Sequence, residues 1–208
     1  MPKINKLEEE YQRLYGHLPD SEEGLLRYIF EHFKIKKDKA KEAITSALER
    51  TWRCYDITLN IIPKPTPRPR ASSDFKHFYV KGAHQHKKYL ESIVKVENIV
   101  CSPTKVSIEV YQPIPLSVMT STEVLLAQLG LIRPIGGGDW DNLAKTYCDM
   151  MQDILICNDN IIVEGSLKKF YSLRPHVDIH LEYLVGFDSK YNEKKVLNSK
   201  SYKNLNKW

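Results

Sequence analysis

The spacing of hydrophobic residues predicts a helical N-terminal region. Across residues 3–50, apolar side chains recur at intervals of three and four with charged residues between them, as on the buried face of a helix. The segment Asp20-Ser21-Glu22-Glu23 has the form of a capping box in front of one such run. Because ten basic and ten acidic residues balance in residues 1–50, we predict a helical extension with no obvious electrostatic docking surface.

Downstream of residue 50, strand-like and helix-like segments are mixed. Val106, Ile108 and Val110 alternate with polar residues, which is typical of a half-buried strand. Strands and helices follow no regular βαβ order, so we predict an α+β fold with a mixed β-sheet flanked by helices. The predicted strands cover residues 55–62, 78–81, 106–110, 161–173 and 177–184, and the predicted helices cover residues 84–96, 117–129 and 141–154.

Length and composition indicate one main domain with extensions. The 208 residues divide, on this interpretation, into the extension 1–50, a body over 51–187 and a lysine-rich tail over 188–208. There is no apolar run long enough to span a membrane and no signal peptide. The four cysteines lack C-x-x-C spacing, so we expect free buried thiols in a soluble cytoplasmic protein.

The charge is unevenly distributed. Residues 51–95 carry nine basic and three acidic residues, residues 139–164 carry six acidic and one basic, and residues 189–208 carry six lysines and one glutamate. Two basic regions around an acidic one suggest a polyanion held near a cation site. Solvated surface is the alternative, and for the lysine tail both interpretations stay open.

Alternating prolines and basic residues over 63–70 predict an extended, stiff arm. Proline removes backbone donors and holds the chain extended, which lowers the entropic cost of binding phosphates. A rigid linker is the alternative. We predict that this arm and the basic residues after it contact DNA phosphates through Lys64, Arg68, Arg70, Lys76, Lys81, His84, Lys87 and Lys88.

The segment 136–145, Gly-Gly-Gly-Asp-Trp-Asp-Asn-Leu-Ala-Lys, carries the candidate chemistry. Asp141, Lys145 and Asp149 lie four residues apart, on one stripe of the predicted helix, and Asp159 follows just before a strand. Helix capping explains one aspartate but not four. Carboxylates without nearby Cys or His favour Mg²⁺ or Mn²⁺, which can lower the pKa of a bound water and stabilise a leaving oxygen.

This run, D-x-D-N-L-x-K followed by Asp149 and by Asn158-Asp159, resembles the RusA family of Holliday junction resolvases of bacteria and their phages. The proline-rich arm is also similar to that family, and the resemblance covers roughly residues 53–185. It implies a homodimer with a mixed sheet that makes paired, Mg²⁺-dependent nicks across four-way junctions and other branched DNA. A two-fold dimer would place two sites on a two-fold substrate.

The resemblance also implies roles for individual residues. Asp139, Asp141 and Asp159 would be the essential metal-binding carboxylates, and Lys145 a catalytic contact to the scissile phosphate. Asn142 and Asp149 would have supporting roles. Two positions depart from the family pattern, since Asn158 replaces an acid and a glycine replaces the proline before the first aspartate.

Other interpretations remain beside this one. A non-catalytic protein that binds branched DNA through a decayed site is the main alternative. A haloacid-dehalogenase-type phosphatase is disfavoured, because glycines stand where that fold needs a hydrophobic strand. His176, Asp178 and His180 share one strand face, but an ordinary amphipathic strand explains them better than a metal site. Trp140 is predicted to be a packing anchor.

Overall fold

The computed structural model describes residues 9, 11–13, 16–17, 21–65, 83–94 and 99–205. It divides the chain into two compact units, Met1–Arg50 and Thr51–Trp208. The predicted strand at 78–81 lies outside the described residues. No described helix is long and apolar enough to cross a membrane.

The described part of the N-terminal unit includes the helices α2 (Glu22–His32) and α3 (Lys37–Leu48). Ser21 caps α2, since its side chain accepts a hydrogen bond from the backbone N–H of Gly24 at 3.2 Å. Tyr28 is buried on α2 and packs edge-on against Tyr11, with ring centroids 5.0 Å apart. Helices are therefore confirmed in the described part of this region.

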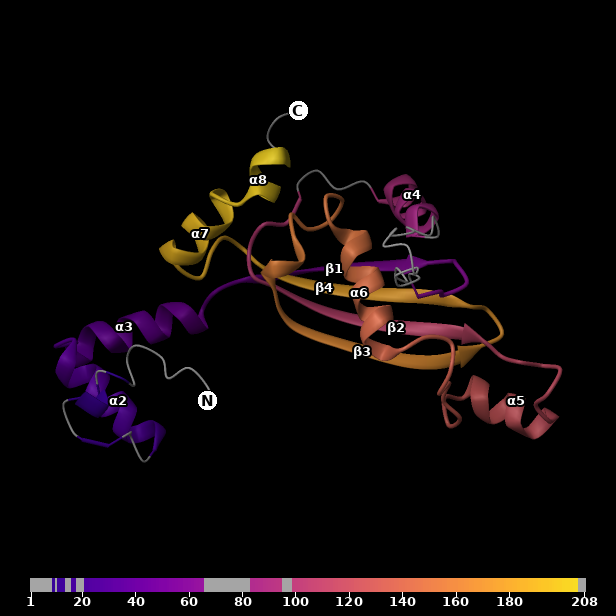
Figure 1. Cartoon of the computed structure of the whole chain (residues 1–208), viewed down its shortest axis with the longest axis horizontal. Helices are drawn as coiled ribbons and strands as arrows, with labels where there is room; N and C mark the ends of the chain where they lie inside the picture. The colour runs from indigo at the N-terminus through magenta and orange to yellow at the C-terminus, as the bar shows by residue number, and fades with distance from the viewer. Residues whose placement is uncertain are drawn as a thin grey trace, which may run out of the picture. The chain divides into compact units, whose positions relative to one another are not determined.

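Four strands form one mixed sheet in the second unit (Figure 1). Their order is β1-β4-β2-β3. β4 pairs antiparallel with both β1 and β2, whereas β2 and β3 run parallel. The bounds are β1 (Trp52–Leu59), β2 (Thr104–Pro113), β3 (Ile162–Ser172) and β4 (His176–Leu184).

Helix α6 (Trp140–Met151) covers one face of this sheet (Figure 1). Its buried residues include Leu143, Tyr147 and Met151, which join Ile108 and Ile179 of the strands in one hydrophobic core. Helix α4 (Ala83–Ile93) packs beside α6 and buries Leu90 there. A mixed sheet with helices against it confirms the predicted α+β class.

The other face of the sheet is polar and hydrogen-bonded. His180 of β4 lies 2.6 Å from a carboxylate oxygen of Asp56 and 3.2 Å from one of Glu182. These contacts raise the pKa of His180 above its ordinary value, mainly through the hydrogen bond to Asp56. Thr58 donates to Asp178 at 2.6 Å on the same face. Antiparallel strands often present such a face to water.

The remaining described helices are α5 (Ser121–Gln128), α7 (Lys190–Leu197) and α8 (Lys200–Leu205). Helix α5 follows β2, whereas α7 and α8 follow β4. Val196 and Leu205 pack against the core, so α7 and α8 are docked on the second unit. The predicted lysine-rich tail is therefore largely helical.

Candidate DNA-cleavage surface

A glycine turn positions the first aspartate of the acidic motif. Gly137 and Gly138 have φ of +75° and +114°, conformations that favour glycine. The side-chain amide of Gln112 donates to the carbonyl oxygen of Gly137 at 2.8 Å, and the Lys169 ammonium donates to that of Gly138 at 3.3 Å. Proline could not adopt the backbone of Gly138, so this turn differs from one that has a proline at this position.

Trp140 fixes the start of α6 to the sheet. Its indole N–H donates to the carbonyl oxygen of Leu167 in β3 at 2.9 Å, although the side chain remains 54% exposed. The predicted anchor thus acts through a hydrogen bond more than through burial. Asp139 occupies the N-cap position, but its side chain makes no capping hydrogen bond. Its carboxylate is therefore not used to begin the helix.

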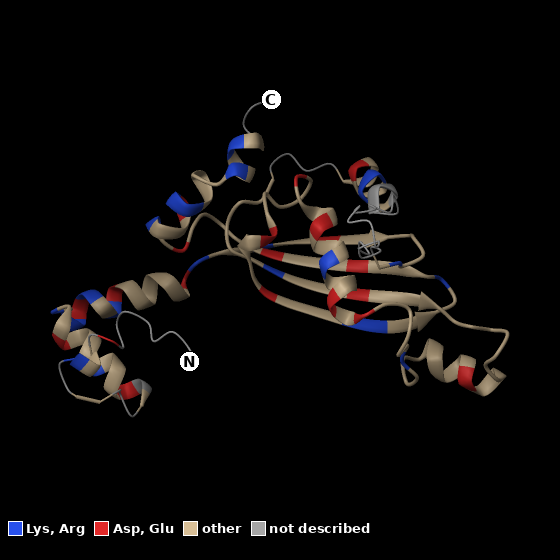
Figure 2. Ribbon diagram, in the orientation of Figure 1, with Lys and Arg blue, Asp and Glu red and all other residues tan. Residues whose placement is uncertain are grey.

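The outward side of α6 carries the predicted charged stripe (Figure 2). Asp141, Lys145 and Asp149 are exposed, whereas the intervening Leu143 and Tyr147 are buried. Asn142, on the first turn, is half-buried. The amphipathic pattern of the helix directs the acids and the lysine away from the core.

Asp159 lies near the C-terminal end of α6, in the 3₁₀ turn Asp159–Ile161. Burial and the neighbouring Asp159 raise the pKa of Asp149, while Lys145 opposes them. Burial, Asp159 and Asp149 together raise the pKa of Cys148 to about 11. Asp149 and Asp159 are thus close enough to repel each other, and a bound cation would relieve that repulsion.

The predicted metal ligands lie toward two ends of α6. Asp139 and Asp141 begin the helix, and eight residues separate Asp141 from Asp149, about 12 Å of helical rise. Carboxylate oxygens suit Mg²⁺. However, within the described residues no three acidic, histidine or cysteine side chains surround one point. The structure therefore does not bring Asp139, Asp141 and Asp159 together as a formed metal site.

Asn158 makes two contacts where the family pattern has an acid. Its side-chain oxygen accepts the backbone N–H of Asn160 at 3.0 Å, and its side-chain N–H donates to the hydroxyl of Ser201 in α8 at 3.2 Å. The amide thereby caps the turn that holds Asp159 and ties that turn to α8.

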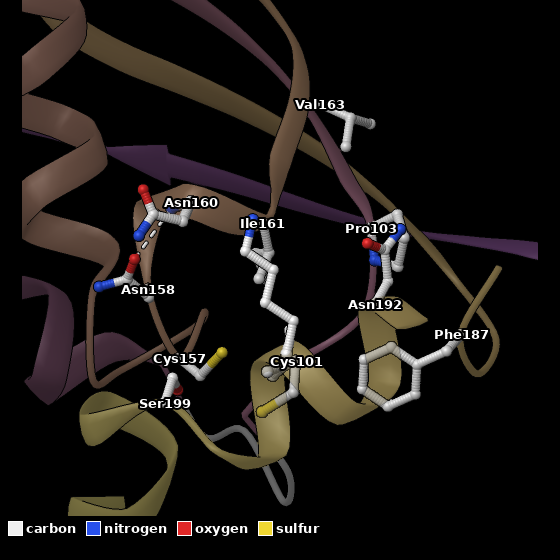
Figure 3. A pocket seen from close by; sticks show the side chains of 12 residues that line it. Cys101, Pro103, Cys157, Asn158, Asn160, Ile161, Val163, Phe187, Asn192 and Ser199 are labelled. Atoms are coloured by element: carbon white, nitrogen blue, oxygen red, sulfur yellow. Dashed lines mark hydrogen bonds between the residues drawn. The ribbon is translucent and has the colours of Figure 1, made fainter. Parts of the chain in front are cut away.

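A pocket of about 380 Å³ lies between this turn and the C-terminal helices (Figure 3). Its polar lining includes Asn158, Asn160, Lys195 and Ser199. Cys101, Cys157, Ile161 and Phe187 give it a partly apolar lining. Cys157 is buried and Cys101 is half-buried, whereas Cys54 is exposed, so the prediction that all four thiols are buried is wrong.

The basic residues predicted to bind DNA are partly described. Lys64 and Lys88 are exposed, and Lys87 forms a 3.7 Å ion pair with Asp153. Burial and then Lys64 lower the pKa of His86, so the start of the proline arm lies beside α4. The backbone of His84 belongs to α4. Outside the described residues lie Arg68, Arg70, Lys76 and Lys81.

The arm also leaves the body next to the acidic motif. A Cβ placed on Gly138 would lie 2.8 Å from the Cγ of Pro65, so Gly138 packs closely against the Pro65 ring. Sequence reasoning missed this contact, together with the roles of Gln112 and Lys169. Those two side chains come from β2 and β3, and no local pattern connects them to the glycines.

The alternating His176, Asp178 and His180 do share one face of β4. His176 lies 3.4 Å from Asp178, and His180 is engaged with Asp56 and Glu182. No group of described residues here has the arrangement of a metal site. An ordinary polar sheet face accounts for these side chains.

Sequence comparisons with known proteins cover the region that holds these residues. The family model for endodeoxyribonuclease RusA matches residues 60–182. A relative from Bacillus subtilis (strain 168), named uncharacterized protein YqaN, is 31% identical over 112 residues, or 53% of this chain and 73% of that protein. The glycine turn, the stripe of α6 and Asp159 all fall within the matched region. Because the family model covers more than half of the chain, the protein belongs to the RusA family of endodeoxyribonucleases.

Proposed function

We propose that this protein is a metal-dependent endonuclease that resolves four-way junctions and other branched DNA by paired nicks. Family membership supports DNA hydrolysis, and one observation carries the assignment of the site. The solvent-facing stripe of α6 presents Asp141, Lys145 and Asp149, with Asp159 close to Asp149 at the C-terminal end of the helix. Acids and lysines arranged in this way suit a phosphodiester held close to a cation.

In this proposal Asp139, Asp141 and Asp159 bind one or two Mg²⁺ or Mn²⁺ ions, Asp139 and Asp141 at the start of α6 and Asp159 near its end. Lys145 contacts the non-bridging oxygens of the scissile phosphate. The bound metal would activate water and offset the charge that develops on the leaving oxygen. Asn142 and Asp149 support these residues. Lys64, Lys87, Lys88 and the basic residues of the arm hold the flanking phosphates, which gives an affinity that falls with salt.

The deciding experiment compares Asp141→Asn with a matched control. An end-labelled four-way junction and a linear duplex of the same sequence are incubated with protein in Mg²⁺, in Mn²⁺ or in chelator. Asp38→Asn is the control, since Asp38 is also an exposed acid in the first turn of a helix. We expect paired nicks near the branch point for wild type and Asp38→Asn, and none for Asp141→Asn.

Junction binding by Asp141→Asn should be retained or tightened, because a negative charge near phosphate is removed. Cleavage by this variant at the wild-type rate would show that the site is assigned wrongly. A protein that hydrolyses a simple aryl phosphate and ignores branched DNA would instead be a phosphatase.

A non-catalytic junction-binding protein is the second candidate. Asn158 stands at a position where the family has an acid, and the described residues form no three-ligand cluster. This candidate predicts a junction that is bound in both Mg²⁺ and chelator and cut in neither. Asn158→Asp then tests the cause. Recovery of cleavage by this variant would identify Asn158 as the reason that the site is inactive.

We also propose that the protein acts as a homodimer through an apolar surface around α5. Residues 114–135 contain only two charged residues. Glu123 is held in the capping box of α5, and Arg133 lies over the ring of Phe170 at 3.6 Å. Six large apolar side chains of this α5 surface are more than half exposed, namely Leu116, Val118, Leu125, Leu129, Leu131 and Ile135.

Exposed apolar side chains gathered in this way are typical of an interaction surface, and each partner contributes roughly 800 Å² to a standard interface. A second copy is the occupant that a two-fold substrate requires. Sedimentation should give a dimer for wild type and for Leu48→Glu, which changes an exposed leucine of α3. Leu129→Glu with Leu131→Glu should give a monomer, and a dimer of this variant would refute the proposed interface.

A further inference from the structure

We propose that α7 and α8 form a second DNA-binding surface, which contacts phosphates of the duplex arm beside the cut strand. This inference rests on the proposed function, because it takes branched DNA as the substrate. The two helices follow the family-matched region, which ends at residue 182. Their surface is named here the C-terminal basic surface, and its lysines are Lys190, Lys194, Lys195, Lys200 and Lys203.

The charged residues of these helices are almost all positive (Figure 2). All five lysines are exposed, and Glu193 is the one acidic residue in the two helices. The half-buried side chains, among them Val196 and Leu205, face the body. Helix α3 differs, since Asp38 and Glu42 lie among its lysines. A concentrated positive surface is what binding to a phosphate backbone requires.

Helix stability does not explain where these lysines stand. The N-terminal end of a helix carries partial positive charge, so a lysine there is unfavourable. Lys190 and Lys200 are nevertheless the first residues of α7 and α8. Lys194 and Lys195 lie in the last turn of α7, where the helix dipole favours them. A bound polyanion would offset the small unfavourable interaction of these two lysines with the helix ends.

The C-terminal basic surface is fixed to the turn that carries Asp159. Asn158 donates to Ser201 of α8 at 3.2 Å, one residue away from Asp159. Lys195 lines the same pocket as Asn158 and Asn160. These two residues, labelled in Figure 3, are the neighbours of Asp159 in the sequence. A strand that passes Asp159 would therefore meet this surface next. The amide at position 158 thus ties the turn that carries Asp159 to the C-terminal basic surface.

The test is a salt titration of DNA binding with two matched triple variants of the full-length protein. Lys190→Gln/Lys195→Gln/Lys200→Gln changes the C-terminal basic surface. Lys37→Gln/Lys39→Gln/Lys41→Gln removes the same charge from α3. Fluorescence anisotropy with a labelled four-way junction, in chelator to prevent cutting, gives the affinity at several salt concentrations. Thermal melting checks the fold, and the first variant should melt no lower than wild type because two unfavourable helix charges are gone.

We expect the C-terminal variant to bind the junction at least about tenfold more weakly at 0.1 M salt. The slope of log affinity against log salt should fall by up to about 2.7, since each phosphate contact contributes about 0.9. The α3 variant should keep both values near wild type. An unchanged slope in the C-terminal variant, or an equal loss in both variants, would overturn the inference.

The two proposals fail in different ways. If wild type binds the junction with a steep salt dependence but does not cut it in Mg²⁺, the nuclease proposal fails and the C-terminal basic surface stands. If wild type cuts the junction and the C-terminal variant binds as tightly as wild type at every salt concentration, the surface fails and the nuclease proposal stands.

Discussion

Replacing Gly138 with alanine should distort the turn that presents Asp139. At φ +114° a residue with a side chain is strained by about 1–3 kcal/mol. The added Cβ would also lie 2.8 Å from the Cγ of Pro65, and such overpacking adds about 1–3 kcal/mol where nothing moves. The Pro65 ring is stiff, so the backbone of the turn must shift. After this relaxation we expect the free energy of unfolding to fall by about 2 kcal/mol.

For a chain of this size, that loss lowers Tm by roughly 4–8 °C. The shift of Asp139 should also reduce junction cleavage by about tenfold to a hundredfold, since a displacement of about 1 Å in an active site has effects of this order. Gly136→Ala is the control within the same turn, because no atom lies within 4 Å of its added Cβ. Its Tm and cleavage rate should match wild type.

Thermal melting and the end-labelled junction assay measure both effects on the same preparations. Equal Tm values and equal cleavage rates for Gly138→Ala and Gly136→Ala would refute the reasoning. A lowered Tm with unchanged cleavage would support the backbone strain at position 138 but would show that the turn does not control the position of Asp139.

Three further predictions concern stability. Asp149→Asn should melt at or above the wild-type Tm at pH 7, because burial and Asp159 raise the pKa of the Asp149 carboxyl and so disfavour its charged form in the folded protein. Added Mg²⁺ should raise the Tm of this variant less than that of wild type. A Tm below that of wild type would contradict this reasoning. The pKa of His180 is raised by its hydrogen bonds to Asp56 and Glu182. The protonated imidazole therefore stabilises the folded protein fully below the ordinary pKa of 6.5, and this stabilisation is lost as the pH rises through the raised pKa. The Tm of His180→Gln should change less than that of wild type between pH 6 and 8. Trp140→Phe loses the hydrogen bond to Leu167 and should melt about 2–4 °C lower, and an unchanged Tm would show that this bond does not anchor α6.

Segments with a strong local pattern were predicted well, but their ends were not. The helix expected over 141–154 spans Trp140–Met151, because Gln152 is extended and Asp153 has φ +66°. Neither residue is a helix breaker by type, so no local signal marked this end. The first strand was expected over 55–62 and spans Trp52–Leu59. Its register follows from pairing with β4, more than a hundred residues away.

In the candidate site too, the residues were predicted from the sequence but their arrangement in space was not. The acids were found because they lie in one segment with helical spacing. Their grouping depends on where the turn after α6 returns the chain, which places Asp159 beside Asp149. Helices α7 and α8 were not predicted, because such short, polar segments become helical mainly through packing. Val196 and Leu205 supply that packing.

The sheet order also governs when the molecule can assemble. β4 is the last strand along the chain, yet it lies between β1 and β2, and β1 pairs with no other described strand. Long-range pairing of this kind slows folding, because the loop must close before contacts form. On the ribosome, β1 waits unpaired until residues 176–184 emerge. A nascent chain that stops short of them lacks an inner strand of the sheet, so the sheet face against which α6 packs is incomplete in unfinished products of translation.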